Sequence, residues 1–157
     1  MKIYIFKKVK TASTVKKGVR KMIKLSEIIE ALEDVDINMS AYYNTKTNEI
    51  LWQNGIEPEY STYKKEDEFN DEVIFMFDFT SKNDYDIMLQ FIYTIDNIEL
   101  KMFLISQVNG RGAFKRFRIA IDTYSLTEKW YKFRDEKYKE IAINWCEDNH
   151  IKYEKDC

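Results

Sequence analysis

The sequence predicts a single α+β domain, in which a small antiparallel sheet precedes a group of helices. Strand-like segments are confined to residues 37–79, whereas helix-like periodicity dominates residues 84–148. Strands first and helices later within one chain are typical of the α+β class. The length of 157 residues fits one domain, and a hydrophobic share of 45% is enough for one core.

A helix and a β-hairpin are the first expected elements. Leucine and isoleucine recur at helical spacing from Leu25, with Ser26 as the expected N-cap. Apolar side chains then alternate over residues 37–43, as in a half-buried strand. ILWQ at 50–53 completes a hairpin, because the loop at 44–49 contains two asparagines, which tolerate the left-handed backbone of tight turns.

A loop, a third strand and four helices are expected next. Residues 54–72 are acidic, contain the only proline and show no period, which predicts a loop, whereas the apolar run VIFMFDF at 73–79 predicts the third strand. Residues 151–153 are compatible with a short terminal strand. Helical periodicity gives the segments 84–95, 98–108, 112–124 and 128–148. We therefore expect an N-terminal helix and a small sheet packed with about four C-terminal helices.

The N-terminal segment is unusually basic. Residues 1–26 contain nine Lys or Arg and no Asp or Glu, as in an arm that binds nucleic acid or an anionic membrane. However, KKGVRKM at 16–22 can be back-translated as AAA AAA GGA GTG AGA AAA ATG, which places a bacterial ribosome-binding sequence before an ATG. We therefore expect residues 1–21 to be mistranslated leader or a disordered extension, with Met22 the natural start and residues 22–157 the globular domain.

Removing the leader changes the charge balance of the chain. Residues 22–157 carry 17 Lys and Arg against 27 Asp and Glu, a net charge of −10. Phosphate neutralisation supplies most non-specific affinity for nucleic acid, so an acidic domain is a poor general nucleic-acid binder.

The stretch NGRGAFKRFR at 109–118 is the most distinctive in the sequence. Gly110 falls where the preceding helix should end, at a position with positive φ, and Gly112 lets the next helix begin close to its neighbour. The spacing lacks the Walker pattern and does not follow a strand, which argues against a nucleotide cradle. A helix-turn-helix fits the pattern without being specific to it. We interpret the stretch as a helix–helix corner with a basic rim.

Arginine is concentrated near this corner, although lysine is about four times as abundant in the chain. A guanidinium offers a planar set of donors that lysine lacks. Two interpretations remain open: buried pairing with carboxylates, or a clamp for an anion or a partner's carboxylate. The candidate binding residues are Arg111, Gly112, Lys115, Arg116, Arg118 and Arg134.

Arg134 has its own expected environment. On a helical wheel it lies at the centre of an apolar stripe that includes Trp130 and Tyr138. A charge there is costly unless it is paired. We therefore expect a largely buried guanidinium, stacked on a ring and held either by a carboxylate from another element or by carbonyls freed at the 109–112 corner.

Signatures of catalysis are scarce. His150 is the sole histidine, and with Cys146 and Cys157 it gives neither metal-ligand spacing nor a thiol–imidazole pair recognisable in sequence. No serine lies in a GxSxG context. We expect no cofactor and no metal, and favour a non-enzyme, although a carboxylate-based enzyme stays open. Two cysteines do not make a disulfide framework, and the apolar IYIF is too short for a signal peptide or a membrane span, which together favour a cytoplasmic protein.

The chain also resembles a bacterial protein family of the uncharacterised UPF series. The resemblance extends from about residue 22 to residue 151, and is strongest over 110–147. It rests on IKLSEIIEALE, YYNTKTNEILW, GRGAFKRF, WYKFRDE and EIAINWCEDNHI. Relatives usually have a glycine near His150, so the end of the last helix departs from the family pattern. The resemblance implies a single bacterial, cytosolic domain and transfers no activity or ligand.

These observations favour a small non-catalytic binding or regulatory protein that acts through the arginine-rich corner, with another protein as its partner. The alternative is a protein or enzyme that binds a small anion, such as a nucleotide or a carboxylate. Nucleic-acid binding is the third and weakest hypothesis, and a membrane partner is not expected. A deep pocket converging on the arginines would favour the anion, and a flat basic rim bordered by rings would favour a protein.

Overall fold

Residues 21–157 are described by the computed structural model, so the first 20 residues of the expected leader lie outside the described part of the chain. The fold is α+β, as predicted. Its principal elements are α1 (Leu25–Asp34), β1 (Met39–Asn44), β2 (Glu49–Asn54), β3 (Val73–Phe77), α2 (Asp84–Tyr93), α3 (Ile98–Gln107), α4 (Ala113–Thr123) and α5 (Thr127–Asp148). Three short 3-10 helices, η1 (Pro58–Tyr60), η2 (Lys65–Phe69) and η3 (Phe79–Lys82), lie in the connections.

The sheet has the strand order β2-β1-β3, with both pairings antiparallel. Ala41 and Tyr43 of β1 are buried, which confirms the predicted alternation over the second half of the segment. Ile37 departs from it. That side chain is 80% exposed, because the chain turns between Asp36 and Met39, whose main chains exchange hydrogen bonds of 3.2 Å. The strand therefore begins at Met39.

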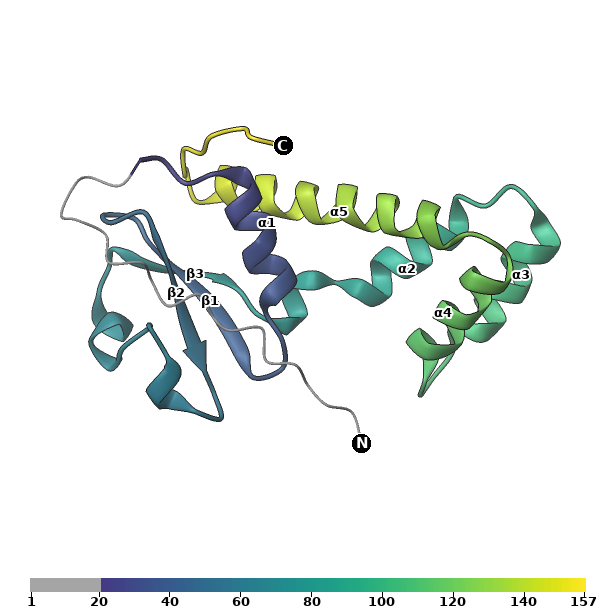
Figure 1. The fold of residues 1–157 in the computed structure, drawn as a ribbon, viewed down its shortest axis with the longest axis horizontal. Coiled ribbons are helices and arrows are strands. Elements are labelled where there is room, and N and C mark those ends of the chain that lie inside the picture. Colours follow the sequence, from purple (N-terminus) through teal and green to yellow (C-terminus); the bar gives the residue numbers. More distant parts are fainter. Residues whose placement is uncertain (1–20) are drawn as a thin grey trace.

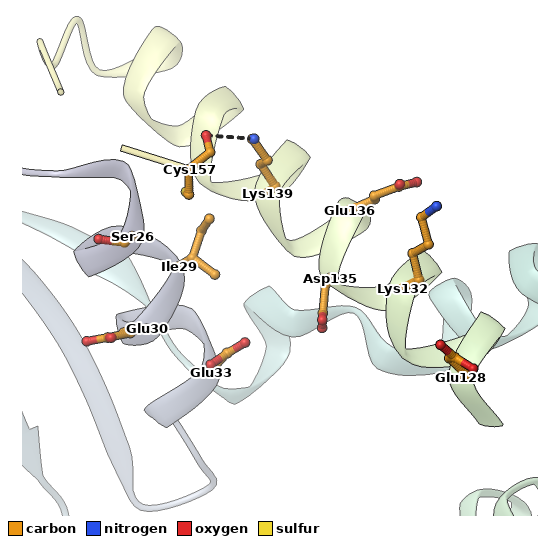
Figure 2. A pocket seen from close by; sticks show the side chains of 10 residues that line it. All are labelled: Ser26, Ile29, Glu30, Glu33, Glu128, Lys132, Asp135, Glu136, Lys139 and Cys157. Carbon is orange, nitrogen blue, oxygen red and sulfur yellow. Dashed lines mark hydrogen bonds between the residues drawn. The ribbon is translucent and has the colours of Figure 1, made fainter. Parts of the chain in front are cut away.

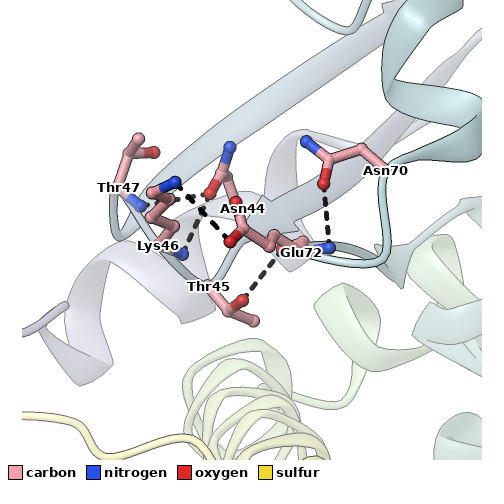
Figure 3. Close-up of polar contacts among 6 residues, drawn as sticks. All are labelled: Asn44, Thr45, Lys46, Thr47, Asn70 and Glu72. Atoms are coloured by element: carbon pink, nitrogen blue, oxygen red, sulfur yellow. Dashed lines mark hydrogen bonds and ion pairs between the residues drawn. The ribbon is translucent and has the colours of Figure 1, made fainter.

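The β1–β2 turn uses both asparagines that were expected to shape it. Asn48 adopts a positive φ of 55°. The side-chain oxygen of Asn44 accepts hydrogen bonds from the backbone N–H groups of Lys46 and Thr47, at 2.9 and 3.1 Å (Figure 3). Lys46 also forms an ion pair with Glu72, which fixes the turn to the segment that enters β3.

Helix α1 begins at Leu25, whereas an N-cap at Ser26 would have placed its first residue at Glu27. Lys24 is the N-cap, and its backbone N–H donates to the Glu27 carboxylate at 2.9 Å. Ser26 lies inside the helix, where its hydroxyl donates to the carboxylate of Asp156. The backbone N–H of Leu25 donates to the Glu154 carbonyl at 2.9 Å. The expected terminal strand is thus reduced to one parallel bridge, which holds the C-terminal tail against the start of α1.

Helix α5 extends along the length of the molecule (Figure 1). The sheet and α1 lie near its C-terminal half, α2 lies near its N-terminal half, and the α3–α4 pair lies at the end opposite the sheet (Figure 1). The indole N–H of Trp145 donates to the Phe75 carbonyl at 3.1 Å and so joins α5 to β3. No helix in the described residues is both long and apolar enough to span a membrane.

Candidate functional site

The connection between α3 and α4 is the helix–helix corner that the glycines predicted. Gly110 and Gly112 have positive φ values of 71° and 79°. A β-carbon added at Gly112 would lie 3.1 Å from Nη1 of Arg116, whereas one added at Gly110 would meet no atom within 4 Å. Gly112 therefore provides both a left-handed backbone and space for the Arg116 side chain.

Arg116 closes this corner with its whole guanidinium. Its Nε donates to the Gln107 carbonyl at 2.8 Å, Nη1 to the Arg111 carbonyl at 2.8 Å, and Nη2 to the Asn109 carbonyl at 2.6 Å. The last carbonyls of a helix have no partner within the helix, and a cation compensates the negative end of its dipole. Arg116 therefore caps α3 from the second turn of α4 and fixes the angle between the two helices.

The other cations of the corner are directed to solvent. Arg111, Lys115 and Arg118 are exposed, and within residues 21–157 none of them forms an ion pair with a carboxylate. Of the six candidate residues, Gly112 and Arg116 thus build the corner, and Arg111, Lys115 and Arg118 form its rim. Arg134 lies on α5 and does not contribute a hydrogen bond to the corner.

The expected environment of Arg134 is correct in one part and wrong in another. Its guanidinium carbon lies 4.9 Å and 5.3 Å from the ring centroids of Tyr131 and Tyr138, as expected for stacking. The side chain is 29% exposed, however, and its carboxylate partner is Asp135, the next residue, at 3.0 Å. The guanidinium lies at the edge of the packed face, where a neighbouring side chain can reach it. It is neither buried nor held by another element, and Arg116 satisfies the corner carbonyls.

Arg134→Ala is therefore expected to lower the free energy of unfolding by about 1–2 kcal/mol. The partly exposed ion pair and the contact with the exposed Tyr131 ring contribute little, and the contact with the buried Tyr138 ring contributes somewhat more. Urea denaturation of the variant beside the wild-type protein measures the difference. A loss of about 3 kcal/mol or more would instead indicate the paired, buried charge that the sequence predicted.

The surface of the α3–α4 pair is unusually apolar. Helix α3 has apolar side chains on all of its sides, yet Leu104 is the only one of its ten residues that is buried. Exposed apolar or aromatic side chains continue on α4 and at its end. Helices α3 and α4 form a helical hairpin, and we call the following set the hairpin surface: Ile98, Met102, Phe103, Arg111, Phe114, Lys115, Arg118, Ile119 and Tyr124. Sequence reasoning located its cations but overlooked the apolar residues of α3, whose all-round pattern in IELKMFLISQ was the available signal.

A shallow groove runs between α3 and α4 within this surface. Its volume is about 280 Å³, and it is lined by Phe103, Gln107, Arg116, Ile119, Ala120, Thr123 and Tyr124. The rings of Phe103 and Tyr124 lie with their centroids 5.6 Å apart. The volume is below the roughly 300–1,000 Å³ of typical small-molecule sites. The groove is therefore suited to a side chain of another polypeptide.

A larger open cavity of about 660 Å³ lies between α1, α5 and the C-terminal tail (Figure 2). Five carboxylates and two lysines line it, and Glu33 and Asp135 point toward the space between the two helices (Figure 2). Lys139 donates to the Cys157 carbonyl at 2.8 Å. No set of three or more potential ligands in the described residues is arranged to hold a metal ion. Sequence reasoning missed this cavity, because carboxylates are abundant throughout the chain.

The remaining groups with chemical potential have structural surroundings. Burial raises the pKa of the Cys146 thiol to about 11, so it stays neutral and poorly nucleophilic at neutral pH. Burial and the hydrogen bond that it donates to Asp84 raise the pKa of Tyr138 far above its ordinary value. His150 is exposed just after α5, with a φ of 56°. Glycine is the residue best suited to that backbone.

Comparison with known proteins places the chain among relatives without an assigned activity. It is 29% identical over 66 residues to the UPF0158 protein PA5073 of Pseudomonas aeruginosa, a match that covers 41% of this chain and 43% of the relative. The chain thus spans less than half of that relative's length. No solved structure matches. The model of the uncharacterised protein family UPF0158 matches residues 20–156, almost the whole of the described chain. The chain therefore belongs to the UPF0158 family.

Proposed function

We propose that this domain is a non-catalytic, cytoplasmic protein-binding module and that the hairpin surface is its contact surface. The observation that carries the proposal is the environment of α3. A helix with apolar residues on all sides is normally buried, yet α3 fully buries only Leu104, and Leu100 and Ile105 are partly buried. Contiguous exposed apolar patches mark interaction sites in soluble proteins. A partner that covers α3 and the groove would supply the missing burial.

The rim supports a protein partner over a small anion. Arg116 is the arginine that lines the groove, and its three donor nitrogens already bind main-chain carbonyls. Arg111, Lys115 and Arg118 are exposed on the same helix pair and do not line the groove, so they do not converge on a pocket. Protein interfaces combine an apolar centre with a polar rim, and arginine and aromatic residues are enriched in them.

The test is capture of partners from the host cytoplasm by immobilised wild-type protein and by two variants. Ile119→Asp places a charge in the groove, and because Ile119 is 58% exposed this change should leave the fold intact. Phe69→Asp is the matched control, since Phe69 is 83% exposed and lies on η2. We expect Ile119→Asp to reduce capture at least about tenfold, the effect of losing one interface hot spot.

Capture that survives Ile119→Asp but is lost in Phe69→Asp would move the binding surface to the η2 side of the molecule and refute the proposal. Circular dichroism and thermal melting of both variants establish that any loss of capture does not arise from unfolding.

A further inference from the structure

We infer that the segment bound by the hairpin surface is an acidic amphipathic helix of a partner protein. This inference rests on the proposed function and specifies the chemistry of the partner. It follows from the shape of the groove, from the distribution of charge along the chain, and from the poor fit of a second copy of the domain.

The shape of the surface favours a helix. Helices α3 and α4 are 10 and 11 residues long and are joined by a corner that Arg116 fixes. The groove between them is lined by Phe103 of α3, by Ile119 of α4 and by Tyr124, whose ring contacts that of Phe103. A preformed groove between two helices accepts the apolar face of a third, whose anchors recur at i, i+3, i+4 and i+7. A volume of about 280 Å³ has room for one or two anchor side chains.

The charge of the surface favours an acidic partner. Residues 98–124 contain five Lys and Arg and two Asp and Glu, whereas the rest of the segment 22–157 contains 12 Lys and Arg and 25 Asp and Glu. The α3–α4 pair is thus a positive region on an acidic domain. Carboxylates that flank an apolar stripe would meet the rim of Arg111, Lys115 and Arg118, and such complementarity steers association and selects among partners.

A second copy of this chain is a poorer occupant. Two copies that meet through the same surface would bring two sets of these three cations together, and such like-charge contacts are unfavourable. The acidic cavity between α1 and α5 of a second copy would be complementary in charge to the hairpin surface. However, its residues are mainly charged, with Ile29 as the one aliphatic side chain, and Ile29 is packed against the core. That cavity therefore has no free bulky side chain to enter the groove.

The proposal is tested with three synthetic, fluorescently labelled helices of about 18 residues, a length at which isolated helices become measurable. The first carries a leucine stripe flanked by glutamates. The second has lysine at each glutamate position, and the third has alanine at each leucine position. Fluorescence anisotropy at low and at physiological salt gives the affinity of each for the full-length protein.

We expect the glutamate helix to bind at least tenfold more tightly than the lysine and alanine helices, with an affinity that falls as salt is added. The double variant Lys115→Glu/Arg118→Glu should reverse the preference and bind the lysine helix. Lys152→Glu, a change at an exposed lysine of the C-terminal tail, should preserve the wild-type preference.

Equal binding of the glutamate and lysine helices, or no binding of either, overturns the inference. The capture experiment with Ile119→Asp does not use these helices. Either result would therefore overturn the acidic helix as the bound segment and leave the proposed protein-binding function to be judged by capture alone. Sedimentation of the protein alone provides a further check. A dimer that Ile119→Asp dissociates would identify a second copy as the occupant and would also overturn the inference.

Discussion

Phe117→Ala is expected to lower the free energy of unfolding by about 3–5 kcal/mol, the range for removal of a buried aromatic side chain. Phe117 is 2% exposed. Its ring centroid lies 4.9 Å from that of Trp130 on α5 and 6.2 Å from that of Phe91 on α2. The side chain therefore lies where three helices meet, and its truncation leaves a cavity that three rigid elements cannot readily close.

Phe114→Ala is the matched control for this experiment, because Phe114 is on the same helix but 49% exposed. We expect it to cost about 1 kcal/mol or less, as is usual for surface substitutions. Urea denaturation of both variants gives the comparison. Equal losses for the two positions would contradict the placement of α4 against α2 and α5.

Arg116→Ala is expected to lower the free energy of unfolding by about 2–3 kcal/mol. Hydrogen bonds to charged groups contribute about 1.5–3 kcal/mol each when they are buried. Here two of the three accepting residues, Asn109 and Arg111, are exposed, so water replaces part of the loss. Arg116→Lys should recover less than half of the difference, because an ammonium group cannot reach three divergent carbonyls.

Arg118→Ala controls for the loss of a positive charge on the same helix and should change stability by at most about 0.5 kcal/mol. The measurement is chemical denaturation at physiological salt, at which exposed charges are largely screened. If Arg118→Ala lowers the free energy of unfolding as much as Arg116→Ala does, the positive charge accounts for the stability and the hydrogen bonds at the corner do not.

Most helices could be predicted from the sequence because the apolar residues of their packing faces recur at helical spacing. The segment 112–124 was expected as a helix, and α4 occupies Ala113–Thr123. The start of α1 was missed partly because Ser26 has a non-local partner, although the hydrogen bond from Lys24 to Glu27 at the true start is local. Ser26 looked like an N-cap, but its hydroxyl donates to Asp156, which is 130 positions away in the sequence. No local pattern can indicate such a partner.

The two arginines show the same limit within the candidate site. A helical wheel placed Arg134 on the packed side of α5 correctly, but it carries no information on which side chains surround that position, and the partner proved to be Asp135. The hydrogen bonds of Arg116 to the corner carbonyls could have been predicted from the sequence. The carbonyls that it binds belong to residues 107, 109 and 111, immediately before the helix that carries it. The all-round apolar pattern of α3 was visible in the sequence, but its exposure was not, because an all-round apolar helix normally indicates burial.

Helix α3 fully buries only Leu104, with Leu100 and Ile105 partly buried, so we expect it to open locally at a lower free-energy cost than the more deeply packed helices. Local opening of this kind exposes backbone to proteases, and the rate of cleavage then follows the population of the open form. A ligand that binds only the closed form lowers that population in proportion to its free concentration. If the proposed partner covers α3, its binding would therefore lower the rate of cleavage, and copies without a partner would be removed sooner than copies with one.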